Sequence, residues 1–101
     1  MNASVLMAIV TEDVADKALD IATAEGIKGA TILPASGISQ SPATTFFGLT
    51  FQDTMKMLVW IAETEKANLA AKVMKDKLNL DSPRQGLALT LQIDQLHGLN
   101  L

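Results

Sequence analysis

Blocks of apolar and polar residues follow one another along the chain and predict an order of secondary structure. Val5–Val10 is apolar at every position, which is typical of a strand that is covered on both faces. An apolar period of three to four residues follows and predicts a helix near 12–25. Thr11 can cap this helix, and Gly26 can end it in the left-handed conformation. The chain is therefore expected to begin with a strand and an amphipathic helix.

A strand, a long polar loop and a second strand come next, read as Gly29–Ala35, Ser36–Asp53 and Met55–Ile61. Pro34 cannot donate to a ladder, so the first of these strands is expected at a sheet edge or where the strand ends. A loop of this length in so small a domain is unusual unless it is functional or disordered. We therefore expect the loop at about 36–53 to serve the function.

The two halves of this loop differ in composition. Residues 36–45 are rich in Ser, Thr, Gly and Pro, which favours irregular backbone over helix or strand, and this half is expected to be mobile. Phe46–Phe51 contains three aromatic residues, which are expected to pack on the body of the protein or across an interface. A short extension of the neighbouring strand is an alternative for this second half.

The last part of the chain predicts one more helix and one more strand. Thr64 can cap a helix near 65–78, and Asn79 can end it. Leu87–Asp94 alternates strictly between apolar and other residues, as a half-buried strand does. The alternation places four apolar side chains on one face: Leu87, Leu89, Leu91 and Ile93.

The predicted order of elements is strand, helix, strand, strand, helix, strand. This order indicates an α+β fold, a ferredoxin-like βαββαβ sandwich whose antiparallel sheet has two helices on one face. Residues 1–101 are expected to form a single domain. Two helices cover one sheet face only, whereas Val5–Val10 and Met57–Ile61 are apolar on both faces. We therefore expect neighbouring copies of the chain to cover the second face.

Composition and charge narrow the possible functions. The chain is 49% hydrophobic and 19% charged, and its mean hydropathy of +0.25 is high for a small soluble domain, which agrees with a buried subunit interface. Its net charge of -3 disfavours nucleic acid as a partner. The absence of cysteine excludes disulfides, zinc-thiolate sites and a cysteine nucleophile. Val5–Val10 is too short for a signal peptide or a membrane span, so a cytoplasmic protein is expected.

The predicted architecture, with its long central loop and a Gly-containing turn before the last strand, resembles the PII-like signalling proteins. Gly26–Gly37 is similar to the family's helix exit, second strand and loop base, and Ser82–Leu87 is similar to the phosphate-side loop before its last strand. The resemblance covers nearly the whole chain. It implies a homotrimeric, non-enzymatic regulator, of the kind known from nitrogen regulation, with small effectors in clefts between subunits and a long loop presented to protein partners.

The resemblance also indicates the residues that would bind an effector, which are Lys28, Gly37, Arg84 and Gly86. Gly37 and Gly86 would offer backbone N–H groups to an anion, although a lone loop glycine also suits a turn. Lys28 and Arg84 would meet phosphate groups through charge-assisted hydrogen bonds.

The sequence also departs from the family at the nucleotide site. Classical members surround the nucleotide with lysines in the phosphate-side loop and arginines on the last strand, whereas this chain has Leu87, Gln95 and Gly98 near those places. Any adenine nucleotide is therefore expected to bind weakly, and the effector is not identified by the sequence. The chain has no tyrosine, so the uridylylation known in some relatives has no acceptor here.

Other functional classes compete with a PII-like regulator. A small ferredoxin-like enzyme would need a cavity between sheet and helices that holds the single histidine, His97, and the single tryptophan, Trp60. We expect Trp60 in the core and His97 at an exposed or edge position, with no catalytic residue and no metal site. A metal-tolerance protein of the CutA type would show metal-dependent behaviour, but the chain has few ligands for a metal. A trimer that serves only as a structural or interaction protein is a further alternative.

Overall fold

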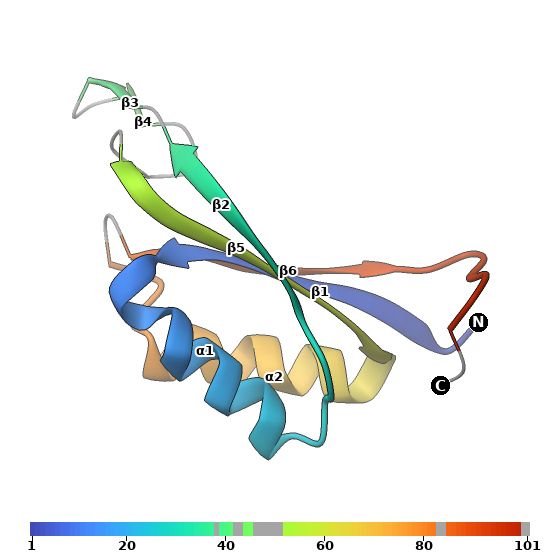
Figure 1. Cartoon of the computed structure of the whole chain (residues 1–101). Coiled ribbons are helices and arrows are strands. Elements are labelled where there is room, and N and C mark those ends of the chain that lie inside the picture. Colours follow the sequence, from blue (N-terminus) through green and yellow to red (C-terminus); the bar gives the residue numbers. More distant parts are fainter. Residues whose placement is uncertain (38, 42–43, 46–51, 83–84, 100–101) are drawn as a thin grey trace.

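The computed structural model describes residues 1–37, 39–41, 44–45, 52–82 and 85–99. The sheet order is β2-β5-β1-β6, the neighbouring strands are antiparallel, and both helices lie on one side of the sheet (Figure 1). The predicted α+β, ferredoxin-like fold is therefore confirmed. In chain order the elements are β1 (Ala3–Thr11), α1 (Glu12–Ala24), β2 (Thr31–Gly37), β3 (Ser39–Ser41), β4 (Thr44–Thr45), β5 (Gln52–Glu63), α2 (Thr64–Lys77) and β6 (Gly86–Gln92).

One face of the sheet forms the core with the two helices, and we call it the covered face. Alternate residues of β1 point toward the helices, and Leu6, Ala8 and Val10 are fully buried. Leu6 lies opposite Trp60 of β5, which is 3% exposed, so the prediction of a core tryptophan is confirmed. The helices contribute small side chains and a few larger ones to this core: Ala15, Ala18, Ile21, Ala22, Ala67, Ala70 and Met74.

Among the described residues, no helix lies over the opposite face of the sheet, and we call it the open face (Figure 1). Directly opposed residues of antiparallel strands project to the same side. Met7, at the middle of β1, lies between Val59 and Leu89, and all three are only partly buried. The same registers place further apolar residues on this face: Val5, Ile9, Met57, Ile61, Leu87, Leu91 and, through its pair with Met57, Leu33.

The alternating strand β6 places its leucines on the open face. Ala88 lies opposite the fully buried Ala8 and packs on the core, so Leu87 and Leu89 must point the other way. Leu91, on the same side, is 55% exposed in the single chain. The predicted half-buried strand is present from Gly86 to Gln92, but its three leucine side chains face away from the helices.

The helix termini follow the sequence signals only in part. Thr11 occupies the N-cap position of α1 but makes no side-chain capping bond, and Gly26, at φ 82°, ends the turn after α1 as expected. Glu63, not Thr64, is the N-cap residue of α2, so that prediction was wrong by one residue. The Thr64 hydroxyl instead shares a hydrogen bond of 3.0 Å with the hydroxyl of buried Ser4. Asn79, at φ 56°, lies in the turn after α2.

The strands next to the long loop differ from the prediction at their ends. β2 begins at Thr31 because Gly29 has a φ of 73°, which an extended strand does not allow. Ser39–Ser41 and Thr44–Thr45 form a short antiparallel pair, so the expectation of irregular backbone was wrong for these residues. Phe46–Phe51 lies outside the described residues.

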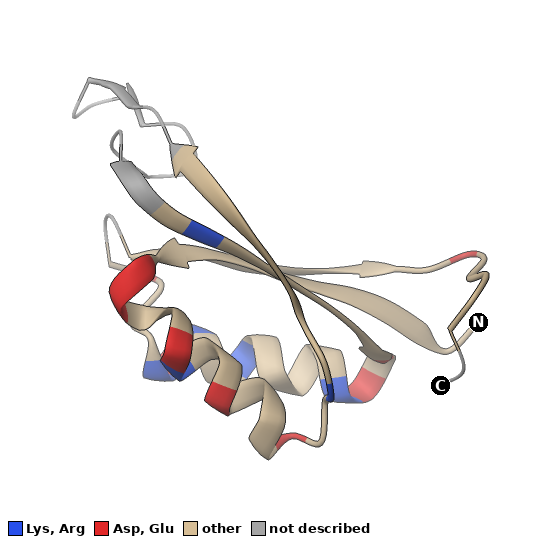
Figure 2. Cartoon of the chain, in the orientation of Figure 1, with Lys and Arg blue, Asp and Glu red and all other residues tan. Residues whose placement is uncertain are grey.

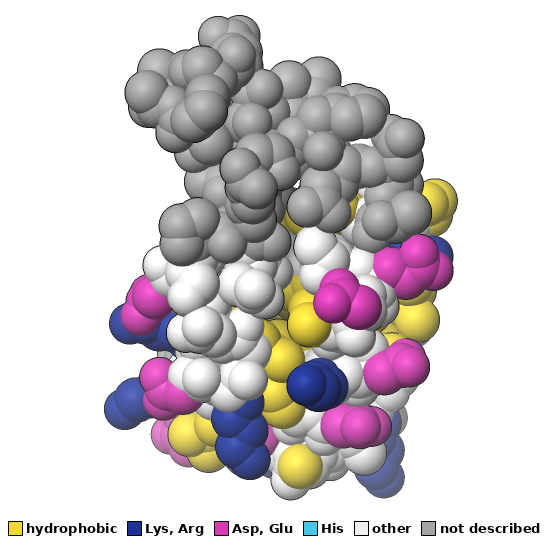
Figure 3. Space-filling model, turned by 90° about the vertical axis from the view of Figure 1, so that its left-hand side faces the viewer, with side chains coloured by type: hydrophobic (Ala, Val, Ile, Leu, Met, Phe, Trp, Pro, Cys, Tyr) yellow, Lys and Arg dark blue, Asp and Glu magenta, His cyan; other side chains and the backbone are white. Residues whose placement is uncertain are grey.

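The two helices differ in charge (Figure 2). α1 contains Glu12, Asp13, Asp16 and Asp20 but a single lysine, and α2 contains Lys66, Lys72, Lys75 and Lys77 with two acidic residues. Figure 3 shows the molecule from the end at which α1 begins. On this side, acidic and basic side chains are interspersed around a small apolar area. No helix in the described part of the chain is long and apolar enough to cross a membrane.

Candidate functional site

A first pocket, the β2-entry pocket, lies where the segment after α1 meets the end of β5 and the first turn of α2. Its volume is about 310 Å³. Ile27, Ile61 and Leu99 supply apolar lining, and the charged lining residues are Lys28, Glu63 and Lys66. With two ammonium groups and one carboxylate around an apolar surface, the pocket suits a small anion with an apolar part.

The ammonium group of Lys66, from α2, also lies next to the C-terminal end of α1. A Cβ added at Gly26 would lie 3.5 Å from the Lys66 ammonium nitrogen, so this ammonium group sits beside the turn that ends α1. The last turn of α1 has no basic residue of its own. A cation at a helix C-terminus is favourable because the carbonyl ends concentrate negative potential there. Lys66 therefore stabilises the helix end that forms one wall of the β2-entry pocket.

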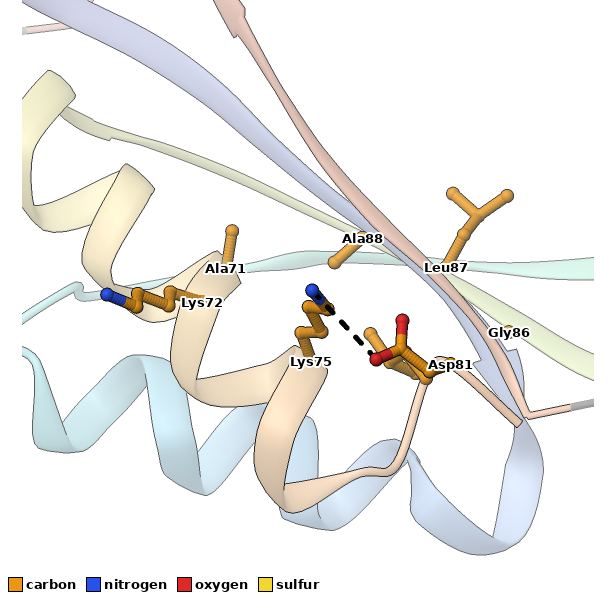
Figure 4. Close-up of a pocket in the computed structure, with 8 residues that line it drawn as sticks. Ala71, Lys72, Lys75, Asp81, Gly86, Leu87 and Ala88 are labelled. Atoms are coloured by element: carbon orange, nitrogen blue, oxygen red, sulfur yellow. Dashed lines mark ion pairs between the residues drawn. The ribbon is translucent and has the colours of Figure 1, made fainter.

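A second pocket, the α2–β6 pocket, lies between the outer flank of α2 and the start of β6 (Figure 4). Its volume is about 420 Å³. Ala71 of α2 and Ala88 of β6 point toward each other across it. Lys75 extends toward Asp81, and their charged atoms are 3.9 Å apart. The remaining lining residues are Lys72, Leu80, Gly86 and Leu87.

Gly86 has a structural reason to be glycine. Its φ of 120° is one that other residues rarely adopt, and a Cβ at this position would collide with the carbonyl oxygen of Ile9. The same Cβ would lie 3.0 Å from the Cα of Val10. The first residue of β6 therefore approaches β1 so closely that a side chain has no room, whether or not its N–H group also meets a ligand.

The other candidate residues lie apart from one another. Gly37 ends β2 opposite Gln52, at the same end of the sheet as Gly86 but on the opposite edge, with β5 and β1 in between. Lys28 precedes β2 at the other end of the sheet, in the β2-entry pocket. Arg84 lies outside the described residues. The described candidates therefore do not converge on one site within a single chain.

Residues named for the alternative functions lie elsewhere. His97 is exposed, and its Nε2 is 3.4 Å from the side-chain oxygen of Gln95, whereas Trp60 is in the core. Neither residue lines the β2-entry pocket or the α2–β6 pocket. Within residues 1–37, 39–41, 44–45, 52–82 and 85–99, no group of three or more His, Asp or Glu side chains could hold a metal ion.

Sequence reasoning did not select three lysines that line the pockets, Lys66, Lys72 and Lys75. From the sequence, Lys75 is only a favourable charge in the last turn of α2. A signal was present in the spacing, because Lys72 and Lys75 are three residues apart and therefore neighbours on the helix surface. Their position beside β6 could not be read from the sequence, because it depends on which flank of α2 faces the sheet edge.

No protein-family model matches the sequence, and a search of curated protein sequences finds no match. Solved structures do match. CPII, a nitrogen regulatory PII-like protein from Thiomonas intermedia K12 bound to ADP, AMP and bicarbonate, is similar with a TM-score of 0.71 and 15% identity, over 96% of each chain. A DUF3240 family protein from Shewanella baltica OS155 is similar with a TM-score of 0.68 and 14% identity, over 99% of each chain.

A putative PII-like signalling protein from Thermus thermophilus is also similar, with a TM-score of 0.66 and 15% identity, over 90% of this chain and 88% of that one. At these identities the likeness shows the fold alone. The chain has the fold of PII-like proteins, and the resemblance inferred from the sequence is confirmed at that level.

Proposed function

We propose that the chain is a regulatory protein of the PII-like kind that catalyses no reaction. It works as a homotrimer, binds a small effector in the clefts between its subunits and presents the 36–53 loop to protein partners. The fold supports this proposal, because the similar structures from Thiomonas intermedia and Thermus thermophilus are described as regulatory or signalling proteins.

The open face is the observation on which the proposal of a trimer rests. β1, β5 and β6 each place three apolar side chains there, centred on Met7, Val59 and Leu89. A contiguous apolar surface of this kind marks an interaction site in a soluble protein. Since all three leucines of β6 point to this face, while Ala88, Thr90 and Gln92 point to the other side, the sequence of β6 is suited to burial from the open side.

A ring of identical copies would also bring two of the separate candidate residues, Gly37 and Gly86, to the same end of the assembly, whereas Lys28 stays at the other end of the sheet. In a cyclic assembly, different surfaces of neighbouring chains meet. The two edges of each sheet are β2 and β6. In a ring with the β6 side of one chain next to the β2 side of the following chain, Gly86 of one and Gly37 of the next lie at the same end of the assembly. A cleft between two subunits therefore lets Gly86 of one chain and Gly37 of the next bind the same ligand, which the two residues of a single chain cannot do.

The proposed effector is a small anion, with adenine nucleotides and bicarbonate as the first candidates because CPII is described as bound to ADP, AMP and bicarbonate. Arg84 provides positive charge to the phosphate site, where Gly37 and Gly86 provide backbone N–H groups, and Lys28 provides positive charge to the β2-entry pocket at the other end of the sheet. A hydrogen bond to a charged group contributes about 1.5–3 kcal/mol. Because the chain has a net charge of -3, nucleotide binding should be weak and should weaken further as salt rises.

A thermal-shift series with ATP, ADP, AMP, cyclic nucleotides, 2-oxoglutarate and bicarbonate tests effector binding, since a ligand that binds the native state raises the melting temperature. Calorimetry on the wild type and on Arg84→Ala should then show weaker nucleotide binding in the variant, and Lys28→Ala should weaken the binding of a ligand that occupies the β2-entry pocket. Lys17→Ala, an exposed lysine of α1, is the matched control and should bind as the wild type does. Tight ATP binding that is unaffected by Arg84→Ala would show that the phosphate site is elsewhere.

A further inference from the structure

The β2-entry pocket presents charges of both signs. Lys28 and Lys66 contribute two ammonium groups, and Glu63 contributes a carboxylate. All three residues are exposed, and among the described residues no ion pair joins these three side chains. The carbonyl end of α1 and the N–H end of α2 both border the pocket, and their opposite partial charges offset each other. The three side chains therefore determine the charge that a ligand meets.

An apolar surface lies beside these charges. Ile27 and Ala62 are 4% and 5% exposed and belong to the core, and Ile61 is partly buried. Leu99 is 51% exposed, and it reaches the pocket from the segment that follows β6, a strand at the opposite edge of the sheet. An apolar group in the pocket would remove more of Leu99 from water, which is favourable. The pocket therefore suits a ligand with an aliphatic part.

The combination of charges and apolar surface narrows the class of ligand. An aliphatic anion is attracted by the two lysines but repelled by Glu63. An aliphatic cation is attracted by Glu63 but meets two ammonium groups. A neutral apolar ligand displaces water from all three charges without replacing the hydrogen bonds of that water. A small zwitterion with an aliphatic side chain offers a partner to each group, and the volume of about 310 Å³ has room for one.

We propose that the β2-entry pocket binds a free α-amino acid with a branched aliphatic side chain, such as leucine. The carboxylate of the ligand accepts hydrogen bonds from the ammonium groups of Lys28 and Lys66. Its ammonium group donates to the carboxylate of Glu63. Its side chain lies against Ile27 and Leu99, so binding also holds the segment after β6 against the segment that leads into β2.

This site is separate from the effector site of the proposed trimer. The effector site lies where Gly37 of one chain and Gly86 of the next meet, at the other end of the sheet. The β2-entry pocket lies beyond the pair of Thr31 with Val59, at which the pairing of β2 with β5 begins. Of its lining residues, only Ile61 belongs to the open face. A ring that buries the open face and the β2 edge therefore leaves the charged groups of the pocket accessible.

Two-dimensional NMR spectra of the full chain test the proposal. Titration with free leucine should shift the amide signals of Lys28, Glu63 and Leu99 and leave those of Gly37 and Gly86 in place. Light scattering on the same sample gives the number of subunits. A monomer, or a chain that binds no effector between subunits, would contradict the proposed function without changing the result for leucine, so the two failures are distinguishable.

Three ligands that each lack one feature of leucine test the role of its groups. Isocaproate lacks the ammonium group, and isoamylamine lacks the carboxylate. Each should bind at least about threefold more weakly than leucine, because it loses one or more partly exposed ion pairs. Glycine lacks the aliphatic side chain and should bind at least about tenfold more weakly, because it buries no apolar surface against Ile27 and Leu99.

Protein variants locate the contacts. Glu63→Gln should weaken leucine binding about threefold to fivefold and strengthen isocaproate binding, because it removes a partner of one ligand and a repulsion of the other. Glu63 makes no side-chain capping bond, so this change leaves the start of α2 intact. Lys28→Gln and Lys66→Gln should each weaken the binding of both ligands to a similar degree.

Lys77→Gln is the matched control, because Lys77 is an exposed lysine of α2 that does not line the pocket, and it should bind leucine as the wild type does. Circular dichroism checks that each variant keeps its helices. Lys28→Gln, which alters an exposed side chain outside the helices, keeps the test valid if Lys66→Gln does not fold.

Four results would overturn the proposal. The first is the absence of amide shifts at the solubility limit of leucine. The second is a set of shifts confined to Gly37 and Gly86, which would place leucine in the other site. The third is leucine binding that Glu63→Gln does not change, which would show a site for carboxylates in general. The fourth is leucine binding to a dissociated variant, such as Val59→Lys, but not to the native assembly, which would show that neighbouring subunits cover the pocket.

Discussion

The covered face and the open face of the sheet are built from the same strands but have different surroundings. On β5, Leu58 points to the helices and is fully buried, while the next residue, Val59, points to the open face and is only partly buried. Both side chains are apolar, so their difference is not one of chemistry. The helices cover one face within the chain, and we expect another molecule to cover the other face.

The largest expected effect comes from a charge at the centre of the open face. Val59→Lys should convert the trimer to a monomer, so that the mass in solution falls from three times the chain mass to the chain mass of 10.8 kDa. The reason is that a subunit interface does not accommodate an unpaired ammonium group. Light scattering at micromolar concentration measures the mass, and circular dichroism should show retained helices.

Leu69→Lys is the control for this test, because Leu69 is an exposed residue of α2 and should leave the mass unchanged. A wild-type protein that is monomeric at micromolar concentration would contradict the proposed trimer. A trimer that survives Val59→Lys would show that the open face is not the interface.

On the covered face, Leu58→Ala should lower the free energy of unfolding by about 2–5 kcal/mol, because it leaves a cavity in the core. Ile32 lies opposite Leu58 but is 50% exposed, so Ile32→Ala should cost distinctly less. Urea unfolding at one fixed protein concentration measures both. Equal losses at the two positions would mean that the β2 edge is as well packed as the centre of the sheet.

Gly86→Ala tests the close approach of β6 to β1. The added Cβ meets the carbonyl oxygen of Ile9, so the variant should lose about 2–4 kcal/mol, from backbone strain and overpacking together. Gly29→Ala is a matched control with φ 73° and no atom within 4 Å of the added Cβ, and it should lose about 1–2 kcal/mol. Hydrogen exchange should show weaker protection of β6 in Gly86→Ala only. Unchanged protection would mean that β6 can shift without losing its pairing.

The smallest expected effect concerns the polar contact on the covered side. Ser4→Ala removes the 3.0 Å hydrogen bond to the Thr64 hydroxyl and should cost about 0.5–1.5 kcal/mol. Thr23→Ala, which removes an exposed bond of 2.9 Å to the carbonyl oxygen of Leu19, should cost less. Thermal unfolding compares the two, and a larger loss for Thr23→Ala would contradict the assignment of Ser4 to the buried side.

Local signals in the sequence determined the order of the elements and hence the fold. Apolar periodicity placed both helices to within about a residue, and Gly26 ended α1 as its conformational freedom predicts. Pro34 correctly marked an edge strand, since it cannot donate to a ladder. These features depend on each residue and its near neighbours along the chain, so one sequence is enough to read them.

Only the tertiary structure decided which residues meet. The alternation in β6 is visible in the sequence, but the side to which Leu87, Leu89 and Leu91 point depends on the register with β1. The pairing of Ala71 with Ala88 around the α2–β6 pocket depends likewise on how α2 lies on the sheet. Residues far apart in sequence become neighbours through packing, and packing is a property of the whole chain that no local pattern records.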